Sequence, residues 1–206
     1  MLSMMRKILT AAALFTLFTH VYAAGDPAAG QEKSAACQGC HGEDGNSPSA
    51  DFPSLAGQNA TYIIKQLKNF KDGNRSNETM SAMAAMLEDQ DMADIAAYFS
   101  SKKGVTTGSG APKEVLNRGR LLYKGGNKKE GMAACAGCHG AKGTGNGPAG
   151  FPALAGQHAD YIERQLLAFK TEERKNDMNH MMRDISFKLT SNDMKAVAAY
   201  LTTLTP

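Results

Sequence analysis

Apolar residues recur at helical spacing through most of the chain. In one stretch they fall at i, i+4 and i+7, at Ile63, Leu67 and Phe70, and a later stretch repeats this spacing at Ile162, Leu166 and Phe169. Two further stretches follow i, i+3, i+4, i+7 at Met92, Ile95, Ala96, Phe99 and at Met194, Val197, Ala198, Leu201. This spacing places apolar side chains on one helix face. Because no convincing alternating run competes, the pattern predicts an all-α protein of short helices joined by Gly- and Pro-rich loops.

The second half of the chain repeats the first. Residues 52–71, FPSLAGQNATYIIKQLKNFK, match residues 151–170, FPALAGQHADYIERQLLAFK, at 13 of 20 positions. A Cys-x-x-Cys-His motif precedes each segment, and a helical pattern containing Asp-Met and Ala-Ala-Tyr follows each. Ordered matches of this length indicate a tandem duplication.

The two copies are separated by a segment of different composition. Residues 101–112, SKKGVTTGSGAP, are rich in Gly, Ser and Thr, which is typical of a linker. The sequence therefore predicts one module at 24–100 and a second at 113–206. The first module opens with Asp26 and Pro27, an N-cap followed by proline at the first helical position.

The first 23 residues form a targeting signal. Arg6 and Lys7 precede an apolar stretch at 8–18, and a small residue, Ala23, ends the segment. This pattern predicts a secretory signal peptide that is cleaved after Ala23, because the apolar stretch is too short to span a membrane comfortably. An uncleaved membrane anchor is the alternative. We therefore expect the mature chain to work outside the cytoplasm, in the periplasm.

Composition excludes several classes of protein. The 206 residues are 42% hydrophobic with a net charge of +3, and no apolar run after residue 23 has transmembrane length. This excludes a polytopic membrane protein and argues against nucleic-acid binding. The small net charge of the whole chain is the sum of two opposite charges, since residues 24–100 carry a net charge of −6 and residues 101–206 a net charge of +7. Such a dipole can orient an encounter with a charged partner.

All four cysteines lie in the two Cys-x-x-Cys-His motifs, at Cys37, Cys40, Cys135 and Cys138. In an exported protein this motif indicates covalent attachment of haem c. The two thiols can reach the porphyrin vinyl groups as thioethers, and the adjacent imidazole, of His41 or His139, becomes the proximal iron ligand. A zinc site and a thioredoxin-like pair are the alternatives, but neither explains a histidine after both pairs. The haem also supplies the apolar core that such small, loop-rich modules lack.

The whole mature chain resembles the dihaem cytochromes c4. The resemblance is carried by CQGCH and CAGCH, by the two FPxLAGQ segments and by the AGDPAAGQ start. It implies two class I cytochrome c domains, each a few helices around a haem c. It further implies a periplasmic carrier that passes electrons from the quinol-oxidising complex to a terminal oxidase. In class I domains, a proline carbonyl accepts a hydrogen bond from the proximal imidazole, and the resemblance assigns this role to Pro53 and Pro152, with Leu55 and Leu154 beside them in the pocket.

The sixth iron ligand is predicted from the repeat. When the last helices are aligned, Met80 coincides with Met182, whereas Met83 and Met86 coincide with other residues. A duplicated site should keep its ligand in both copies, and a thioether favours Fe(II) and raises the potential. Met80 and Met182 also fall where the cytochrome c4 pattern has its axial methionines. The neighbouring residues Met83, Met181 and His180 remain alternatives.

We therefore expect an electron carrier rather than an enzyme, with two His/Met-ligated haems c. Its partners would be redox proteins, the upstream quinol-oxidising complex and the downstream oxidase. We expect a monomer, and peripheral association with the membrane stays open. The alternatives are a haem-c subunit of a larger oxidoreductase complex, a dihaem peroxidase and a haem-based gas sensor.

Overall fold

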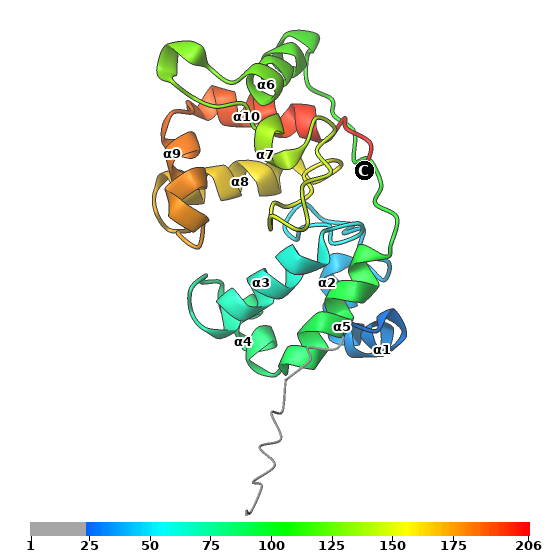
Figure 1. Ribbon diagram of the computed structural model, residues 1–206. Helices are drawn as coiled ribbons and strands as arrows, with labels where there is room; N and C mark the ends of the chain where they lie inside the picture. Colours follow the sequence, from blue (N-terminus) through cyan, green and yellow to red (C-terminus); the bar gives the residue numbers. More distant parts are fainter. Residues whose placement is uncertain (1–23) are drawn as a thin grey trace, which may run out of the picture.

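The structure, a computed structural model, describes residues 24–206 (Figure 1). The predicted signal peptide, residues 1–23, lies outside the described residues. The first five helices are α1 (Pro27–Lys33), α2 (Ala35–His41), α3 (Ala60–Lys71), α4 (Glu78–Ala85) and α5 (Asp89–Ser100). The second set is α6 (Lys113–Gly125), the 3-10 turn η1 (Lys128–Glu130), α7 (Ala136–His139), α8 (Ala159–Lys170), the 3-10 turn η2 (Met178–His180), α9 (Met181–Phe187) and α10 (Ser191–Leu201).

The two sets of helices form two lobes, one above the other in Figure 1, with an extended segment running along one side between them. Over residues 24–206 the backbone forms helices and two isolated bridges, Asn127 with Met132 and Asn146 with Phe151, and no strand. The prediction of an all-α protein is therefore confirmed. None of the helices in this range is both long and apolar enough to cross a membrane.

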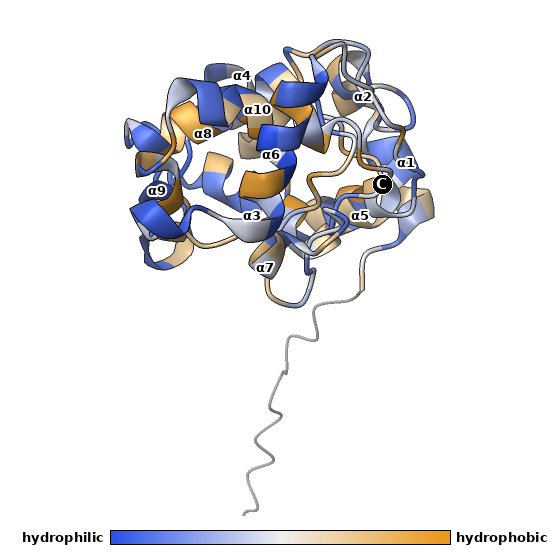
Figure 2. Ribbon diagram, turned by 90° about the horizontal axis from the view of Figure 1, so that it is seen from above, coloured by the Kyte–Doolittle hydropathy of each residue, from blue (hydrophilic) through white to orange (hydrophobic). Residues whose placement is uncertain are grey.

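The predicted apolar positions form the core of each lobe. Ile63, Leu67 and Phe70 of α3 are 6 to 8% exposed, and their equivalents in α8 are equally buried. The apolar residues predicted for α5 and α10 are at most 3% exposed. Viewed from above in Figure 2, several helices carry both blue and orange segments, as expected of amphipathic helices.

The first and last helices of each lobe cross in close contact because a glycine stands at the crossing. A Cβ atom on Gly30 of α1 would lie 2.0 Å from the Asp94 carbonyl oxygen of α5. A Cβ atom on Gly119 of α6 would lie 2.0 Å from the Ala196 carbonyl oxygen of α10. Only glycine permits this separation, so the same crossing is built twice.

Polar caps fix the ends of these crossing helices. Asp26 caps α1 by accepting a 2.8 Å hydrogen bond from Ala28 N, and Pro27 follows as the first helical residue, which confirms the predicted start. Asp94 of α5 accepts from Asp26 N at 2.8 Å and pairs with Lys33 Nζ at 2.6 Å. The hydrogen bonds from Lys33 and from Asp26 N lower the pKa of Asp94 to about 2. In the second lobe Arg118 of α6 pairs with Asp193 of α10 at 2.8 Å; Asp193 is the counterpart of Asp91, and Ala196 stands in the place of Asp94.

The segment between the lobes is anchored at both ends. The side chain of Asn46 donates to Lys103 O at 3.0 Å and accepts from Val105 N at 2.9 Å, which attaches the segment to the first lobe. Gly108 N donates to Thr202 O at 3.1 Å, which attaches it to the second. Its composition is that of a flexible linker, but these hydrogen bonds hold its path.

Candidate functional site

Each Cys-x-x-Cys-His motif lies on a short helix. Cys37, Cys40 and His41 belong to α2, while Cys138 and His139 belong to α7, with Cys135 as its N-cap. Residues at i, i+3 and i+4 share one helix face, so both thiols and the imidazole of a motif point to the same side. All four cysteines are free thiols, and burial raises the pKa of the Cys135 thiol to about 11.

The two motif histidines are held in identical ways. His41 and His139 are each 6% exposed, and burial lowers the pKa of both imidazoles, which keeps them neutral. His41 Nδ1 lies 2.8 Å from Pro53 O, and His139 Nδ1 lies 3.0 Å from Pro152 O. Because a carbonyl oxygen only accepts, Nδ1 must donate in both cases. The lone pair on Nε2 is then free to bind a metal.

The core clusters bring the predicted pocket residues together. In the first lobe Cys37, Leu55 and Met80 pack against one buried cluster that includes Ile63 and Phe99. In the second lobe the equivalent side chains pack against the corresponding cluster, and these are Cys135, Leu154 and Met182. Attachment thiol, pocket leucine and predicted axial methionine therefore converge on the same apolar surface in each copy.

Both predicted axial methionines are positioned through their backbone. Met80 N donates to the N-cap side chain of Asn77 at 2.9 Å in α4. Met182 N donates at 3.0 Å to Asp177, which also pairs with Arg183 Nε at 2.8 Å. A polar side chain three to five residues earlier therefore holds each methionine at the start of its helix.

The alternative ligands are placed differently. His180 is exposed, and its backbone adopts the left-handed conformation, with φ 59°, as does that of Asn179 before it, with φ 51°. Met83 and Met181 are half-buried but, unlike Met80 and Met182, do not belong to the described core clusters. Met86 and Met178 are 71% and 54% exposed. These positions favour Met80 and Met182 as the residues that face each haem.

The residues present fit a haem c in each lobe. Each site offers two thiols and a neutral imidazole from one helix face, together with a thioether and apolar side chains from the core, which is the donor set of a six-coordinate haem. One buried hydroxyl, Ser186 Oγ beside the second site, has no hydrogen-bond partner among residues 24–206. No group of three or more His, Cys, Asp or Glu in this range is arranged to hold a metal ion.

A reciprocal hydrogen-bond network joins the two lobes, and the sequence analysis missed it. Gln58 donates to Ala153 O at 2.9 Å and accepts from Ala153 N at 2.8 Å. Gln157 makes the same pair of bonds with Ser54, each 2.9 Å long. Both glutamines are 7% exposed. Each glutamine is the last residue of a LAGQ segment. The recurrence of a glutamine at the same place in both copies was therefore the sequence feature that could have indicated a shared structural role.

Two arginines extend this network with the same symmetry. Arg75 donates to Tyr161 Oη at 3.1 Å and to Gln165 Oε1 at 2.8 Å. Arg174 donates to Tyr62 Oη at 3.0 Å and to Gln66 Oε1 at 3.1 Å. Burial alone would raise the pKa of Tyr62, but the adjacent guanidinium groups lower it overall. The interface is self-complementary, as in a twofold dimer.

Comparison with known proteins assigns both lobes to one family. The profile of the family described as Cytochrome c matches residues 27–103 and 119–205. The chain is 48% identical to the cytochrome c4 of Pseudomonas aeruginosa, covering 87% of this chain and 89% of that protein. It is 37% identical to the thiosulfate dehydrogenase electron acceptor of Thiomonas intermedia, covering 96% and 90%. The crystal structure of reduced recombinant cytochrome c4 from Pseudomonas stutzeri superposes with a TM-score of 0.83 at 44% identity, covering 88% of this chain and 100% of that one.

Proposed function

The chain belongs to the cytochrome c family and is a dihaem electron-transfer protein of the cytochrome c4 type, and from this premise we propose that it carries electrons in the periplasm from a quinol-oxidising complex to a terminal oxidase. In this role Cys37, Cys40, Cys135 and Cys138 hold two haems c as thioethers. When bound, each haem supplies an iron that gains and loses one electron. The protein determines how firmly each oxidation state is held.

One observation carries the proposal: a buried imidazole and a methionine flank the same apolar core in both copies. The Pro53 and Pro152 carbonyls hold Nδ1 of His41 and His139, so Nε2 of each imidazole is left to bind iron when a haem is present. Met80 and Met182 supply the second axial ligands. Because two strong ligands leave no open coordination position, this arrangement favours electron carriage over peroxidase or gas-sensor chemistry.

The interface between the lobes supports transfer of electrons within the molecule. The reciprocal bonds of Gln58 and Gln157 and the arginine contacts tie the backbone of each lobe to the other. Their fixed geometry keeps the two haem sites at a constant separation. An electron that enters one lobe can therefore leave from the other without any rearrangement of the chain.

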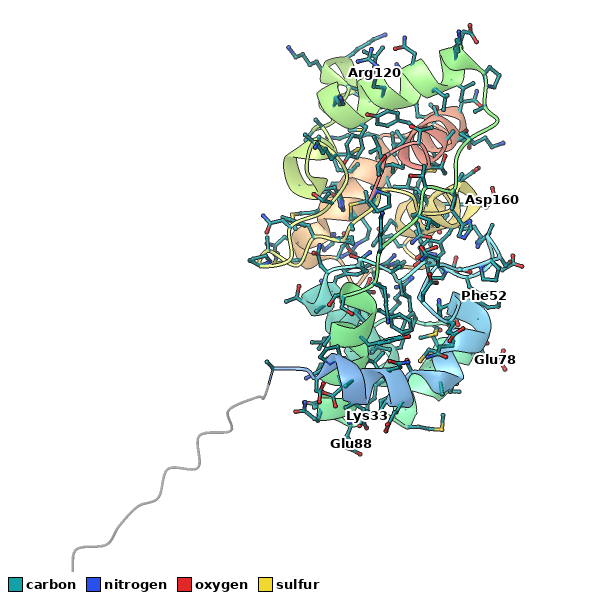
Figure 3. The ribbon with its side chains drawn as sticks, turned by 90° about the vertical axis from the view of Figure 1, so that its right-hand side faces the viewer. Lys33, Phe52, Glu78, Glu88, Arg120 and Asp160 are labelled. Carbon is teal, nitrogen blue, oxygen red and sulfur yellow. The ribbon has the colours of Figure 1, made fainter. Side chains whose placement is uncertain are left out.

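Charge separation supports the use of different partners by the two lobes. Glu88 of the acidic first lobe and Arg120 of the basic second lobe lie at opposite ends of the molecule (Figure 3). Net charges of −6 and +7 on residues 24–100 and 101–206 make an electric dipole along this direction. We expect an electropositive partner to dock at the first lobe and an electronegative partner at the second. Transfer rates with both partners would then fall as ionic strength rises.

The similarity to a thiosulfate dehydrogenase electron acceptor favours a second candidate function. In that role the chain would take electrons from a dehydrogenase, as the name of the relative states for thiosulfate dehydrogenase, in place of the quinol-oxidising complex. The haem sites and their chemistry would be unchanged. Reduction of the purified protein by each type of donor, compared at equal concentration, distinguishes the two sources.

The ligand assignment is tested on the purified, oxidised dihaem protein. We expect the charge-transfer band between methionine sulfur and ferric iron, and we expect Met80→Ala and Met182→Ala each to remove about half of it. Met86→Ala and Met178→Ala are matched controls, because these side chains are 71% and 54% exposed, and should leave the band intact. A high-spin spectrum of the native protein, or full retention of the band in Met80→Ala and Met182→Ala, would contradict the proposal.

A further inference from the structure

The second lobe carries a buried serine, Ser186, on α9. Its side chain is fully buried, at 0% exposure, and its hydroxyl has no hydrogen-bond partner among the described residues. Hydroxyls at the ends of two other helices bond to a carbonyl of the preceding turn. Thr171 Oγ1 donates to Leu167 O at 3.1 Å, and Thr202 Oγ1 donates to Ala199 O at 2.8 Å. Ser186 does not use this common solution.

The register of α9 shows what the hydroxyl faces. Met182, Ile185 and Leu189 belong to or pack against the core cluster of the second lobe. Ser186 shares this inward face, one turn after Met182, because residues at i and i+4 are neighbours on a helix. The first lobe has the same arrangement, with Met80 followed one turn later by Ala84, which is also 0% exposed. At this position the two lobes therefore differ by one buried hydroxyl.

A buried hydroxyl without an acceptor destabilises the folded chain. The hydroxyl lies on the helix face that carries Met182, which packs against the core cluster of the second lobe. We propose that Ser186 donates a hydrogen bond to the sulfur of Met182 in the haem-loaded protein and raises the reduction potential of the second haem. The proposal rests on the axial role assigned to Met182 above.

The direction of the effect follows from the electronics of the ligand. A donor at the remaining sulfur lone pair withdraws electron density from the thioether. The sulfur then stabilises Fe(III) less, so Fe(II) is favoured and the potential rises, in line with the control that hydrogen bonds around ligands exert on metal sites. Ala84 offers no such donor to Met80. The hydroxyl thus biases the electron towards the second lobe.

The test exchanges the two residues in the dihaem protein. Ser186→Ala should lower the potential of the second-lobe haem and leave the first-lobe haem unchanged, and Ala84→Ser should raise the potential of the first-lobe haem. We expect a change of about three- to tenfold in the reduction equilibrium, which is ~30–60 mV for one electron. The proton resonance of the Met182 methyl group should shift in Ser186→Ala, whereas that of Met80 should not. Ser191→Ala, an exposed serine on α10, is the matched control.

The outcomes separate this inference from the proposed function. If the oxidised wild-type protein shows the methionine band for both haems but Ser186→Ala moves neither a potential nor the Met182 methyl signal, this inference is wrong and the carrier function stands. A rise in the denaturation midpoint of Ser186→Ala without a change in potential would show that the hydroxyl stays unsatisfied, which also overturns the inference. If Met182→Ala keeps its share of the band, Met182 is not axial, and both proposals fall.

Discussion

The interface glutamines allow a direct test of whether the two lobes act as one unit. In Gln58→Leu, the side chain keeps much of its volume but loses its bonds to Ala153 N and Ala153 O, which are 2.8 and 2.9 Å long. A buried group that loses its partner costs roughly 1–3 kcal/mol. Because Ala153 is half-buried and water can replace part of the loss, we expect about 2–3 kcal/mol for the two groups together. Gln58 Oε1 also accepts a hydrogen bond from Asn59 N at 2.9 Å within the first lobe, so a further, local part of the loss does not come from contacts between the lobes.

The expected result is loss of coupling rather than loss of either fold. Guanidinium denaturation of wild-type protein, followed by far-ultraviolet circular dichroism, should give one transition. Gln58→Leu should lower the midpoint of this transition and broaden the transition or split it into two. Gln157→Leu should do the same, because Gln157 makes the equivalent bonds to Ser54. The exposed Gln31→Leu change on α1 is the control. If both interface variants unfold at the wild-type midpoint in a single transition of wild-type slope, the reasoning is refuted.

Three further predictions concern single positions. Glu172 has φ 59° where the first lobe has Gly73 at φ 73°. Glu172→Gly relieves the left-handed backbone strain but adds the conformational entropy of a glycine to the unfolded chain, so it should stabilise the fold by about 0.5–1 kcal/mol. Gly73→Glu should destabilise it similarly, and denaturant midpoints measure both changes. Gly119→Ala places a Cβ atom 2.0 Å from Ala196 O and should cost about 1–3 kcal/mol by forcing α6 from α10, whereas Gly125→Ala, at the end of the same helix with no atom within 4 Å, should cost little. Asp94 has a folded pKa of about 2, below its ordinary 3.8, mainly because of Lys33. Its contribution to folding stability is complete above pH 4 and is lost as pH falls towards 2, so Asp94→Asn should be about 1 kcal/mol less stable at pH 7. The variant should also flatten the acid limb of a stability–pH curve, and an unchanged acid limb would contradict this assignment.

The helices and the haem-attachment residues were predictable because both follow from local pattern. Ile63, Leu67 and Phe70 are buried as their spacing indicates, and the equivalent positions of α5, α8 and α10 behave likewise. The two Cys-x-x-Cys-His motifs needed only sequence neighbours to be recognised. Proximity of Pro53 and Pro152 to the imidazoles followed from the resemblance rather than from any periodic signal.

The contacts between lobes were not predictable from local pattern. Gln58 bonds to Ala153, and Arg174 bonds to Tyr62, across separations of 95 and 112 residues. Such pairs leave no trace in hydrophobic periodicity, because each residue reads alone as an ordinary polar position of a loop or helix. Similarly, the Gly- and Ser-rich composition of residues 101–112 indicates a flexible linker, but composition carries no information about the Asn46 and Thr202 bonds that fix its path.

Duplication explains why the few differences between the lobes carry the direction of electron flow. Two identical halves would give two haems of equal potential, and the symmetric bonds of Gln58 and Gln157 would favour neither. The thiols, imidazoles, prolines, leucines and methionines of the two sites are the same, so they set the common range of potential and not its order. A difference in potential between the two haems must therefore come from residues near a haem that differ between the copies. Ala84 in the first lobe and Ser186 in the second are such a pair, and both are buried beside the predicted axial ligand. The opposite net charges of the lobes act at longer range, on partners, and the buried hydroxyl acts on the iron.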